Sequence, residues 1–322
     1  MTTALQPNIP LKTYRFFFDF DLPLKLPKFA GSAWRGAFGT ALKKTVCVVR
    51  NTPCNECMLK SSCAYSYVFE TPPPDNTEKM RKYNAAPHPF VLRLVDGKNQ
   101  SKSQYALDLT LFGHAGRFFP YLVYALQRAG LEGIGGHRQI FSLKTIVDMS
   151  DADNRNIIYE DGKLTQNTCA ASPEIPAMPA HITINLLTPL RVKQGGKNVS
   201  HTHFSFGAFF STLLRRISMI SYFHTDTPLE TDFAALTAQA KNTEFSTQQL
   251  SWYDWTRYSS RQDMEMNMGG LVGKLQLDMQ GLEKFWPYLW LGQWTHLGKG
   301  TSMGLGAYSI QMTSLSNDTI VV

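Results

Sequence analysis

The sequence of 322 residues contains no run approaching the roughly 18 uninterrupted apolar residues that a membrane-spanning helix needs. Residues 1–10 also lack the basic and apolar regions of a secretory signal peptide. These absences predict a cytoplasmic protein without a membrane partner. Charged residues make up only 18% of the chain and hydrophobic residues 43%. That composition excludes a disordered chain and suits a globular protein long enough for two domains.

Cysteine is scarce, with five in the chain, and four of them lie in the short stretch 47–63. A Cys-x2-Cys pair with two further cysteines nearby can complete a tetrahedral zinc site, and disulfides are rare in chains that are not secreted. We therefore expect a structural zinc ion bound by Cys47, Cys54, Cys57 and Cys63. A loop of free thiols is the alternative.

A glycine-rich stretch, residues 298–306, is the most distinctive part of the chain. Glycine allows positive φ and close approach of another chain, and main-chain N–H groups beside a lysine suit a phosphate. Neither familiar nucleotide motif fits. The residue after Lys299 is glycine, which breaks the P-loop pattern, and a loop leading from helix to strand reverses the order of a dinucleotide fingerprint. The net charge of +7 favours an anionic partner only weakly.

The chain contains an internal similarity. Phe118–Leu122 and Phe285–Leu289 both read aromatic-aromatic-Pro-Tyr-Leu, and each leads into an apolar helix. Each helix is followed by a glycine turn, Gly133–Gly135 in the first case and Gly304–Gly306 in the second. Landmarks that recur in one order indicate a duplication. The strand and helix patterns around them predict the order β-α-β-β-α-β twice, which is the ferredoxin-like arrangement.

The predicted fold class is therefore α+β, with two tandem ferredoxin-like domains of the RRM-like type. The first domain covers residues 1–150 and contains the cysteine cluster, residues 47–63, as an insert. A polar, proline-punctuated connection covers residues 151–180. The second domain covers residues 181–322 and contains the glycine-rich loop 298–306.

Five motifs follow one another along nearly the whole chain: Trp34–Gly39, the cysteine cluster running into Phe69-Glu70, Arg257–Ser259, Gly269–Gly273 and His296–Gly306. Together they resemble the CRISPR precursor-RNA processing endoribonucleases of the RAMP superfamily. The resemblance implies a glycine-rich loop beside bound RNA and metal-independent cutting of CRISPR repeat RNA into guide RNAs. In that reaction the RNA 2′-hydroxyl attacks the adjacent phosphorus, leaving a 2′,3′-cyclic phosphate and a 5′-hydroxyl. No catalytic cofactor is expected.

Many members of that family carry a catalytic histidine on or near the first helix, whereas residues 32–46 contain none. Arg35 is a cation available on this helix and is a catalytic candidate. Three histidines near the glycine and lysine loops are further candidates: His137, His201 and His203. His88 ranks below them because it is remote from these loops in the sequence.

The residues expected to bind RNA are cations and loop glycines: Lys299, Arg138, Lys193, Lys197, Arg257, Arg261, Gly298, Gly300, Gly304 and Gly306. For each cation, a solvated surface charge is the alternative interpretation. The expected partners are CRISPR repeat RNA and other CRISPR effector or spacer-acquisition proteins. Two other functions stay open. The first is a RAMP-fold subunit that holds a guide RNA without cutting, which the missing histidine favours. The second is a zinc-stabilised adaptor protein.

Overall fold

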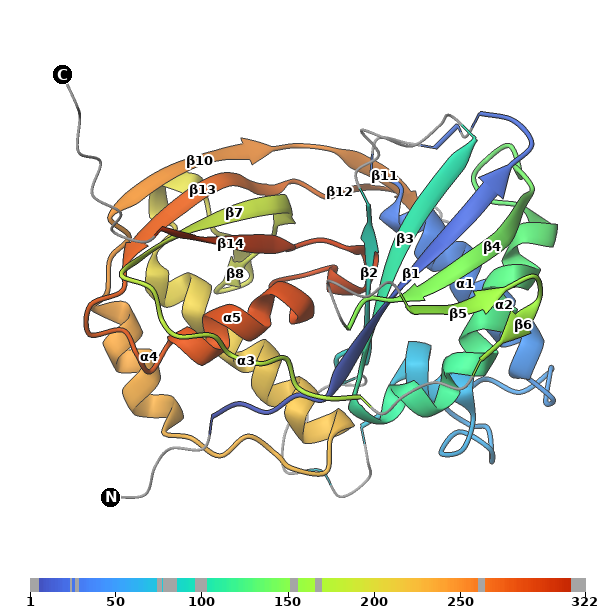
Figure 1. The fold of residues 1–322 in the computed structure, drawn as a ribbon, viewed down its shortest axis with the longest axis horizontal. Coiled ribbons are helices and arrows are strands. Elements are labelled where there is room, and N and C mark those ends of the chain that lie inside the picture. Colours follow the sequence, from blue (N-terminus) through green and yellow to red (C-terminus); the bar gives the residue numbers. More distant parts are fainter. Residues whose placement is uncertain are drawn as a thin grey trace.

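The structure is a computed structural model that describes residues 6–23, 25–26, 29–73, 77, 86–95, 103–150, 156–165, 170–259 and 264–313. Within these ranges it omits the side chains of residues 257–259, 264–267 and 313. Helices and antiparallel sheets are mixed along the chain, which confirms the predicted α+β class (Figure 1). In the described ranges, every helix is too short or too polar to cross a bilayer.

The first half contains a six-stranded antiparallel sheet in the spatial order β2-β3-β1-β4-β5-β6. Its strands are β1 (Leu11–Phe20), β2 (Phe90–Leu94), β3 (Gln104–Phe112), β4 (Phe141–Asp148), β5 (Asn156–Glu160) and β6 (Lys163–Leu164). The helices α1 (Gly31–Val46) and α2 (Phe119–Glu132) cover one face. The hairpin β5-β6 lies within residues 151–180, the segment expected to connect the domains, and extends this sheet past β4.

Alternating side chains on β1 explain why the helices cover that face. Tyr14, Phe16 and Phe18 are fully buried, and Trp34 from α1 packs against Phe18 with ring centroids 4.8 Å apart. Residues between them in the strand point to the opposite face because the side-chain period of a strand is two. The buried residues of α1, which include Trp34, Phe38 and Leu42, therefore form the face that contacts the sheet.

The second half contains a four-stranded antiparallel sheet in the order β10-β13-β7-β14. These strands are β7 (His181–Leu190), β10 (Thr247–Tyr253), β13 (Gly270–Asp278) and β14 (Tyr308–Thr313). In both halves, the third of these strands along the chain pairs with the first, the second pairs with the third at the edge of the sheet, and the fourth pairs with the other side of the first. Helices α3 (Phe206–His224), α4 (Phe233–Lys241) and α5 (Trp286–Thr295) lie below this sheet in Figure 1.

Shorter elements connect these parts of the fold. Two small hairpins pair β8 (Lys193–Gln194) with β9 (Lys197–Asn198), and β11 (Thr256–Ser259) with β12 (Met264–Asn267). Four single turns of helix are η1 (Ser66–Glu70), η2 (Gly113–Phe118), η3 (His201–His203) and η4 (Thr301–Met303). Of these, η1 and η4 lie beside the candidate site.

The two halves share an apolar core. Val91 from β2 and Phe112 from β3 belong to the same buried cluster as Phe209 and Leu213 from α3. At this junction Tyr67 from η1 also contacts His224 from α3, with 2.9 Å between the hydroxyl and Nδ1. Burial of apolar surface between the halves therefore holds the start of α1 beside the glycine-rich loop.

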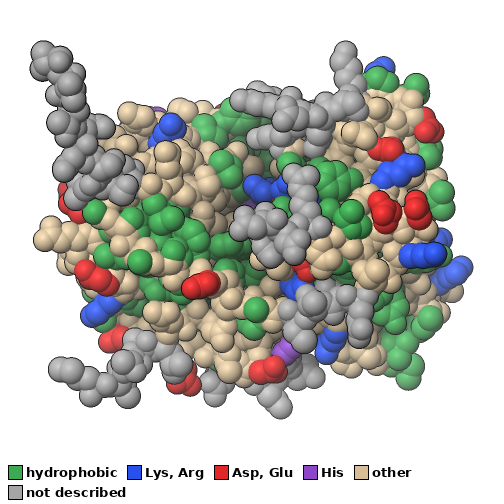
Figure 2. Space-filling view, viewed as in Figure 1, with side chains coloured by type: hydrophobic (Ala, Val, Ile, Leu, Met, Phe, Trp, Pro, Cys, Tyr) green, Lys and Arg blue, Asp and Glu red, His purple; other side chains and the backbone are tan. Residues whose placement is uncertain are grey.

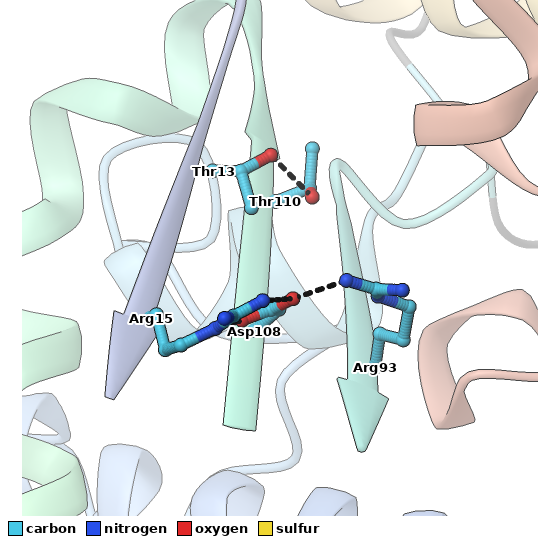
Figure 3. Close-up of polar contacts among 5 residues, drawn as sticks. All are labelled: Thr13, Arg15, Arg93, Asp108 and Thr110. Atoms are coloured by element: carbon cyan, nitrogen blue, oxygen red, sulfur yellow. Dashed lines mark hydrogen bonds and ion pairs between the residues drawn. The ribbon is translucent and has the colours of Figure 1, made fainter. Parts of the chain in front are cut away.

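A buried carboxylate fixes β2 in place at the same junction. Asp108 on β3 is only 2% exposed and accepts hydrogen bonds from Arg15 Nε at 2.7 Å and Arg93 Nη2 at 2.6 Å (Figure 3). Beside it, the hydroxyls of Thr13 and Thr110 lie 2.9 Å apart. The arginines are directly opposite Asp108 in the strand register, so one carboxylate links three neighbouring strands. Such a carboxylate is stable when buried because charged partners occupy its lone pairs.

Candidate active site

The glycine-rich loop is fixed to the end of β7. The main-chain N–H of Lys299 donates to Arg191 O at 3.0 Å, and that of Gly306 donates to Pro189 O at 3.1 Å. Thr188 Oγ1 donates to Gly304 O at 2.7 Å. These bonds hold the loop as a rigid turn between α5 and β14.

The loop is wedged between the two halves. Gly304 has a φ of +88°, and a Cβ on it would lie 2.6 Å from Leu92 O on β2. At the start of α1, a side chain on Gly31 would overlap the carbonyl oxygen of Met303. Thr301 and Ser302 are buried in this contact, whereas Lys299 is exposed. Much of the glycine requirement thus comes from protein backbone that approaches the loop.

Arg35 contacts this loop directly. Its Nε donates to Ser302 Oγ at 3.1 Å, and its Nη2 lies 3.0 Å from His88 Nε2. The guanidinium also lies over the ring of Phe69 from η1, 5.3 Å from the centroid. Arginine, histidine and serine from three distant parts of the sequence therefore meet where α1 touches the loop.

The contacts of His88 define its tautomer. A guanidinium can only donate hydrogen bonds, so His88 Nε2 must accept, and the ring proton must be on Nδ1. Nδ1 lies 3.0 Å from Thr71 Oγ1, which can accept that proton. Burial, and then the charge of Arg35, lower the pKa of His88 to about 3. At neutral pH His88 is a neutral imidazole with its lone pair directed at Arg35.

A second cation, Arg216, lies near this cluster and acts on three histidines. Arg216 on α3 donates through Nε to Thr295 O at 3.2 Å, and its buried Nη2 has no hydrogen-bond partner within the described residues. Burial lowers the pKa of Arg216 to about 10. Its charge in turn contributes to the lowered pKa of His88, His224 and His296. Among the described residues no carboxylate forms an ion pair with Arg216, so its charge adds positive potential that suits a phosphate.

We expect the protein to lose stability between pH 7.5 and pH 5. Burial is the main cause of the lowered pKa of His88 (about 3), His224 (about 4) and His296 (about 3). Each histidine has a pKa near 6.5 when unfolded, so below that pH the unfolded chain binds protons that the folded protein does not. Below pH 6.5, each of these histidines should therefore lower the free energy of unfolding by about 1 kcal/mol per pH unit. The partly exposed His88 should lower it by less. Urea unfolding at both pH values measures the difference.

Replacing His224 with asparagine serves as the control for this measurement. The variant should show a shallower decline with acid, because one histidine that titrates only on unfolding has been removed. An unfolding free energy that stays constant from pH 7.5 to pH 5, or rises towards acid, would contradict the expectation.

The other catalytic candidates lie on exposed turns. His201 and His203 are in η3, where His203 Nδ1 lies 2.9 Å from Ser200 Oγ. His137 is exposed in the first glycine turn, next to Arg138, which has a φ of +48°. A Cβ on Gly135 in that turn would lie 2.9 Å from the Leu26 side chain, so this turn packs against the loop that follows β1. Among the described residues, Arg35 contacts the glycine-rich loop through Ser302. No described contact joins His137, His201 or His203 to that loop.

The candidate RNA-binding cations fall into two groups. Lys193 and Lys197 are exposed on the hairpin β8-β9, which leaves the same end of β7 to which the loop is fixed, and Lys299 is exposed on the loop. Arg138 is exposed on the first glycine turn. The side chain of Arg257 and all of Arg261 lie outside the described residues. In Figure 2, described acidic and basic side chains are scattered over the visible face, so local clusters matter more than net charge.

The glycines Gly298, Gly300, Gly304 and Gly306 all have positive φ. Where a Cβ would approach backbone, it would meet Arg191 at Gly298, Leu92 at Gly304 and Leu297 at Gly306. Their proposed contact with RNA stays a prediction.

The predicted zinc site is not supported. Cys47, Cys54, Cys57 and Cys63 are free and partly exposed, and within the described chain no three His, Cys, Asp or Glu side chains are placed to hold a metal. Cys47 caps α1, and its thiol donates to Val49 O at 3.3 Å. Burial raises the pKa of the Cys54 thiol. The spacing of the cysteines suits zinc, but the described residues contain no group of ligands placed to bind it.

Two family models match the chain in succession. Residues 9–172, half of the chain, match the family AF_1859_N, described as an N-terminal domain. Residues 184–308 match CRISPR_Cas6, the CRISPR-associated endoribonuclease Cas6. The class of protein is thus that of CRISPR-associated RNA processing. The chain belongs to the family of this N-terminal domain, and its second half is similar to Cas6, which confirms the resemblance inferred from the sequence.

Solved structures show the same fold. A Cas6 product complex aligns over 94% of this chain and 100% of its own, with a TM-score of 0.58 at 15% identity. The Cas6 of Thermus thermophilus aligns over 94% and 99%, with a TM-score of 0.53 at 15% identity. A partial Cas6-RT-Cas1–Cas2 complex aligns over 97% of this chain and 47% of its own, with a TM-score of 0.55 at 13% identity. Likeness at these identities establishes the fold alone.

An uncharacterized protein of Archaeoglobus fulgidus is 26% identical over 173 residues, which make up 52% of this chain and 57% of that relative. The chain thus spans little more than half the length of this curated relative.

Proposed function

We propose that the protein is a metal-independent endoribonuclease that cuts CRISPR repeat RNA where α1 meets the glycine-rich loop. The observation that carries this proposal is the contact of Arg35 with both Ser302 and His88, inside a chain whose second half is similar to Cas6. This contact supplies a cation that can stabilise the charge on phosphate and a neutral imidazole that can act as a base, two of the groups that a transesterification of RNA uses.

In the proposed reaction the RNA 2′-hydroxyl attacks the adjacent phosphorus. As the new P–O2′ bond closes a 2′,3′-cyclic phosphate on one product, the P–O5′ bond breaks, and the leaving 5′-oxygen takes a proton from water to become a 5′-hydroxyl. The guanidinium of Arg35 would hold the scissile phosphate and stabilise the charge that develops on its oxygens. Ser302 would position Arg35 by accepting from Nε, and buried Arg216 would add positive potential behind it.

His88 is the base that this geometry favours. When a phosphate takes over Arg35 as a partner, Nε2 of His88 loses its present donor and can accept the proton of the 2′-hydroxyl. Thr71 keeps the ring proton on Nδ1, so the correct lone pair remains available. The anion would also raise the pKa of His88 from its low value, which makes the imidazole a stronger base at the moment of binding. His137, His201 and His203 remain candidates for contacts with RNA.

We further propose that each half is a ferredoxin-like domain, in the order found for β1 to β4 and for β7, β10, β13 and β14. The proposed limits are 1–150 and 181–322. CRISPR repeat RNA is the proposed substrate, and effector or spacer-acquisition proteins are proposed partners. The solved Cas6-RT-Cas1–Cas2 complex shows one such assembly for a protein of similar fold.

The test is incubation of the purified protein with labelled CRISPR repeat RNA in excess EDTA. A matched RNA carries a 2′-deoxy substitution at the cut site. We expect a single cut in the first RNA, no cut in the second, and products ending in a cyclic phosphate and a 5′-hydroxyl. Tight binding of both RNAs without a cut would favour a guide-holding subunit instead, and dependence on added metal would refute the proposed mechanism.

A further inference from the structure

A basic pocket of about 380 Å³ lies at the other end of α1. Four cations and one thiol line it: Lys43, Lys44, Arg50, Arg128 and Cys47. They come from the last turns of α1, the loop after it and the middle of α2. Cations of three segments thus face one hollow.

The pocket has few negative charges of its own. Glu132 accepts from Lys44 Nζ at 2.6 Å and from Arg128 Nε at 3.4 Å, and the bond from Lys44 lowers its pKa. Within the described part of the chain, no carboxylate forms an ion pair with Lys43 or Arg50. One carboxylate for four cations leaves a positive hollow that suits an anion.

A ladder of stacked side chains connects this pocket to the candidate active site. Arg35, Gly39 and Lys43 follow one another at a spacing of four residues, so they share one face of α1. Arg35 lies over Phe69, and Lys43 lies 5.4 Å from the centroid of Tyr65. The two rings stack on each other at 5.6 Å with an interplanar angle of 8°.

One contact keeps this ladder close to α1, and one carboxylate lies at its edge. Gly39 lets η1 approach, since a Cβ there would lie 2.7 Å from Phe69 Cε1. The carboxylate of Glu70 at the edge of the ladder accepts a hydrogen bond from the Tyr65 hydroxyl at 3.1 Å. The two cations of the ladder are about 12 Å apart along the helix, the rise of about three to four stacked nucleotides.

We propose that the pocket is a second phosphate-binding site, which holds the RNA strand after it runs from the catalytic centre along this face of α1. The inference rests on the proposed function, because it takes the RNA cut beside Arg35 as the ligand. Phosphates of the strand would contact Lys43 and Arg50, whose charges are free to receive them. Because these contacts involve phosphates and not bases, the pocket would increase affinity for any RNA sequence that is long enough to reach it.

The experiment measures binding of 2′-deoxy repeat RNAs that cannot be cut. One is limited to the cleavage site, and the others extend from it by increasing lengths in either direction. We expect affinity to rise once the strand on one side reaches the pocket. In the double variant Lys43→Gln/Arg50→Gln, that gain should fall about ten-fold, and the slope of log affinity against log salt should decrease by about 1.4.

A control variant removes the same charge elsewhere. Lys241→Gln/Lys284→Gln takes two exposed lysines from the far end of the second half, at α4 and before α5. This variant should keep the ratio of affinities for long and short RNAs. Equal losses in both double variants, or an unchanged ratio in Lys43→Gln/Arg50→Gln, would overturn the proposed path.

A second measurement uses the unaltered protein. Alkylation of Cys47, followed by mass spectrometry with Cys57 as reference, should slow several-fold when the long RNA is bound and not when the short RNA is. Equal protection by inorganic triphosphate would assign the pocket to a small anion and overturn the RNA path. Binding with this pattern but without cutting of normal RNA would refute the proposed activity alone, and absence of any RNA affinity would refute both.

Discussion

Replacing Arg35 with alanine should slow cleavage of repeat RNA by about 10³-fold under single-turnover conditions. The guanidinium is the only described side chain that contacts both the glycine-rich loop, through Ser302, and His88. Its removal takes away a charge that stabilises the transition state and frees the lone pair of His88 with no phosphate held beside it. The cleavage rate of Arg35→Lys should lie between those of the unaltered protein and Arg35→Ala, because lysine keeps the charge but cannot contact Ser302 and His88 at once.

Two further measurements separate catalysis from folding in this experiment. Guanidinium ion added to Arg35→Ala should restore part of the rate, which would not occur if the variant were misfolded. Arg215→Ala, on the exposed face of α3, is the matched control and should cleave at the normal rate. An Arg35→Ala protein that binds and cuts RNA normally would remove this site from consideration.

The companion variant His88→Ala should lose about 10²-fold if His88 is the general base. In the unaltered protein, the acid limb of the kcat/KM profile should lie well below pH 6.5, because the pKa of free His88 is lowered to about 3 and the base form persists in mild acid. Loss of activity with a midpoint near pH 6.5 would contradict the assignment of His88 as the base.

Features of the fold that depend on local pattern could be predicted from the sequence. Alternating aromatic residues predict β1, because period two places Tyr14, Phe16 and Phe18 on one face. The stripe on α1 follows in the same way from Trp34, Phe38 and Leu42. The hairpin β5-β6 shows the limit of this approach, since the segment 151–180 reads as a polar connection and a pairing partner on β4 is visible only in the folded chain.

The candidate site was only half predictable. Glycine content singled out the loop, and Arg35 stood out because its helix carries no histidine. The sequence did not single out His88 because its partners, Arg35 and Thr71, are distant from it along the chain. The prolines on both sides of His88 also leave no helical or strand periodicity there. The stacking of Phe69 and His88 on Phe90 brings the histidine to α1, which is a tertiary effect. In the cysteine cluster the spacing fitted zinc, but spacing alone does not fix where the four sulfurs lie in the folded chain.

Gly31→Ala and Gly36→Ala should have opposite effects, although both are the same substitution in the same helix. A Cβ on Gly31 would overlap the carbonyl oxygen of Met303, which is backbone and cannot rotate away, so the loop or the helix must shift. Such overpacking costs about 1–3 kcal/mol. The shift also separates Arg35 from Ser302, and a displacement of about 1 Å at a catalytic group can cost about 10²-fold in rate.

Gly36 has no atom within 4 Å of its added Cβ and is exposed within the same helix. Alanine there should stabilise the protein by about 0.5–1 kcal/mol, because glycine loses more backbone entropy in a helix. Cleavage should stay within about two-fold. Urea unfolding and single-turnover cleavage of both variants provide the test. If Gly31→Ala cut RNA normally, contact between α1 and the loop would not be needed for catalysis, and the active site would have to lie elsewhere on the loop.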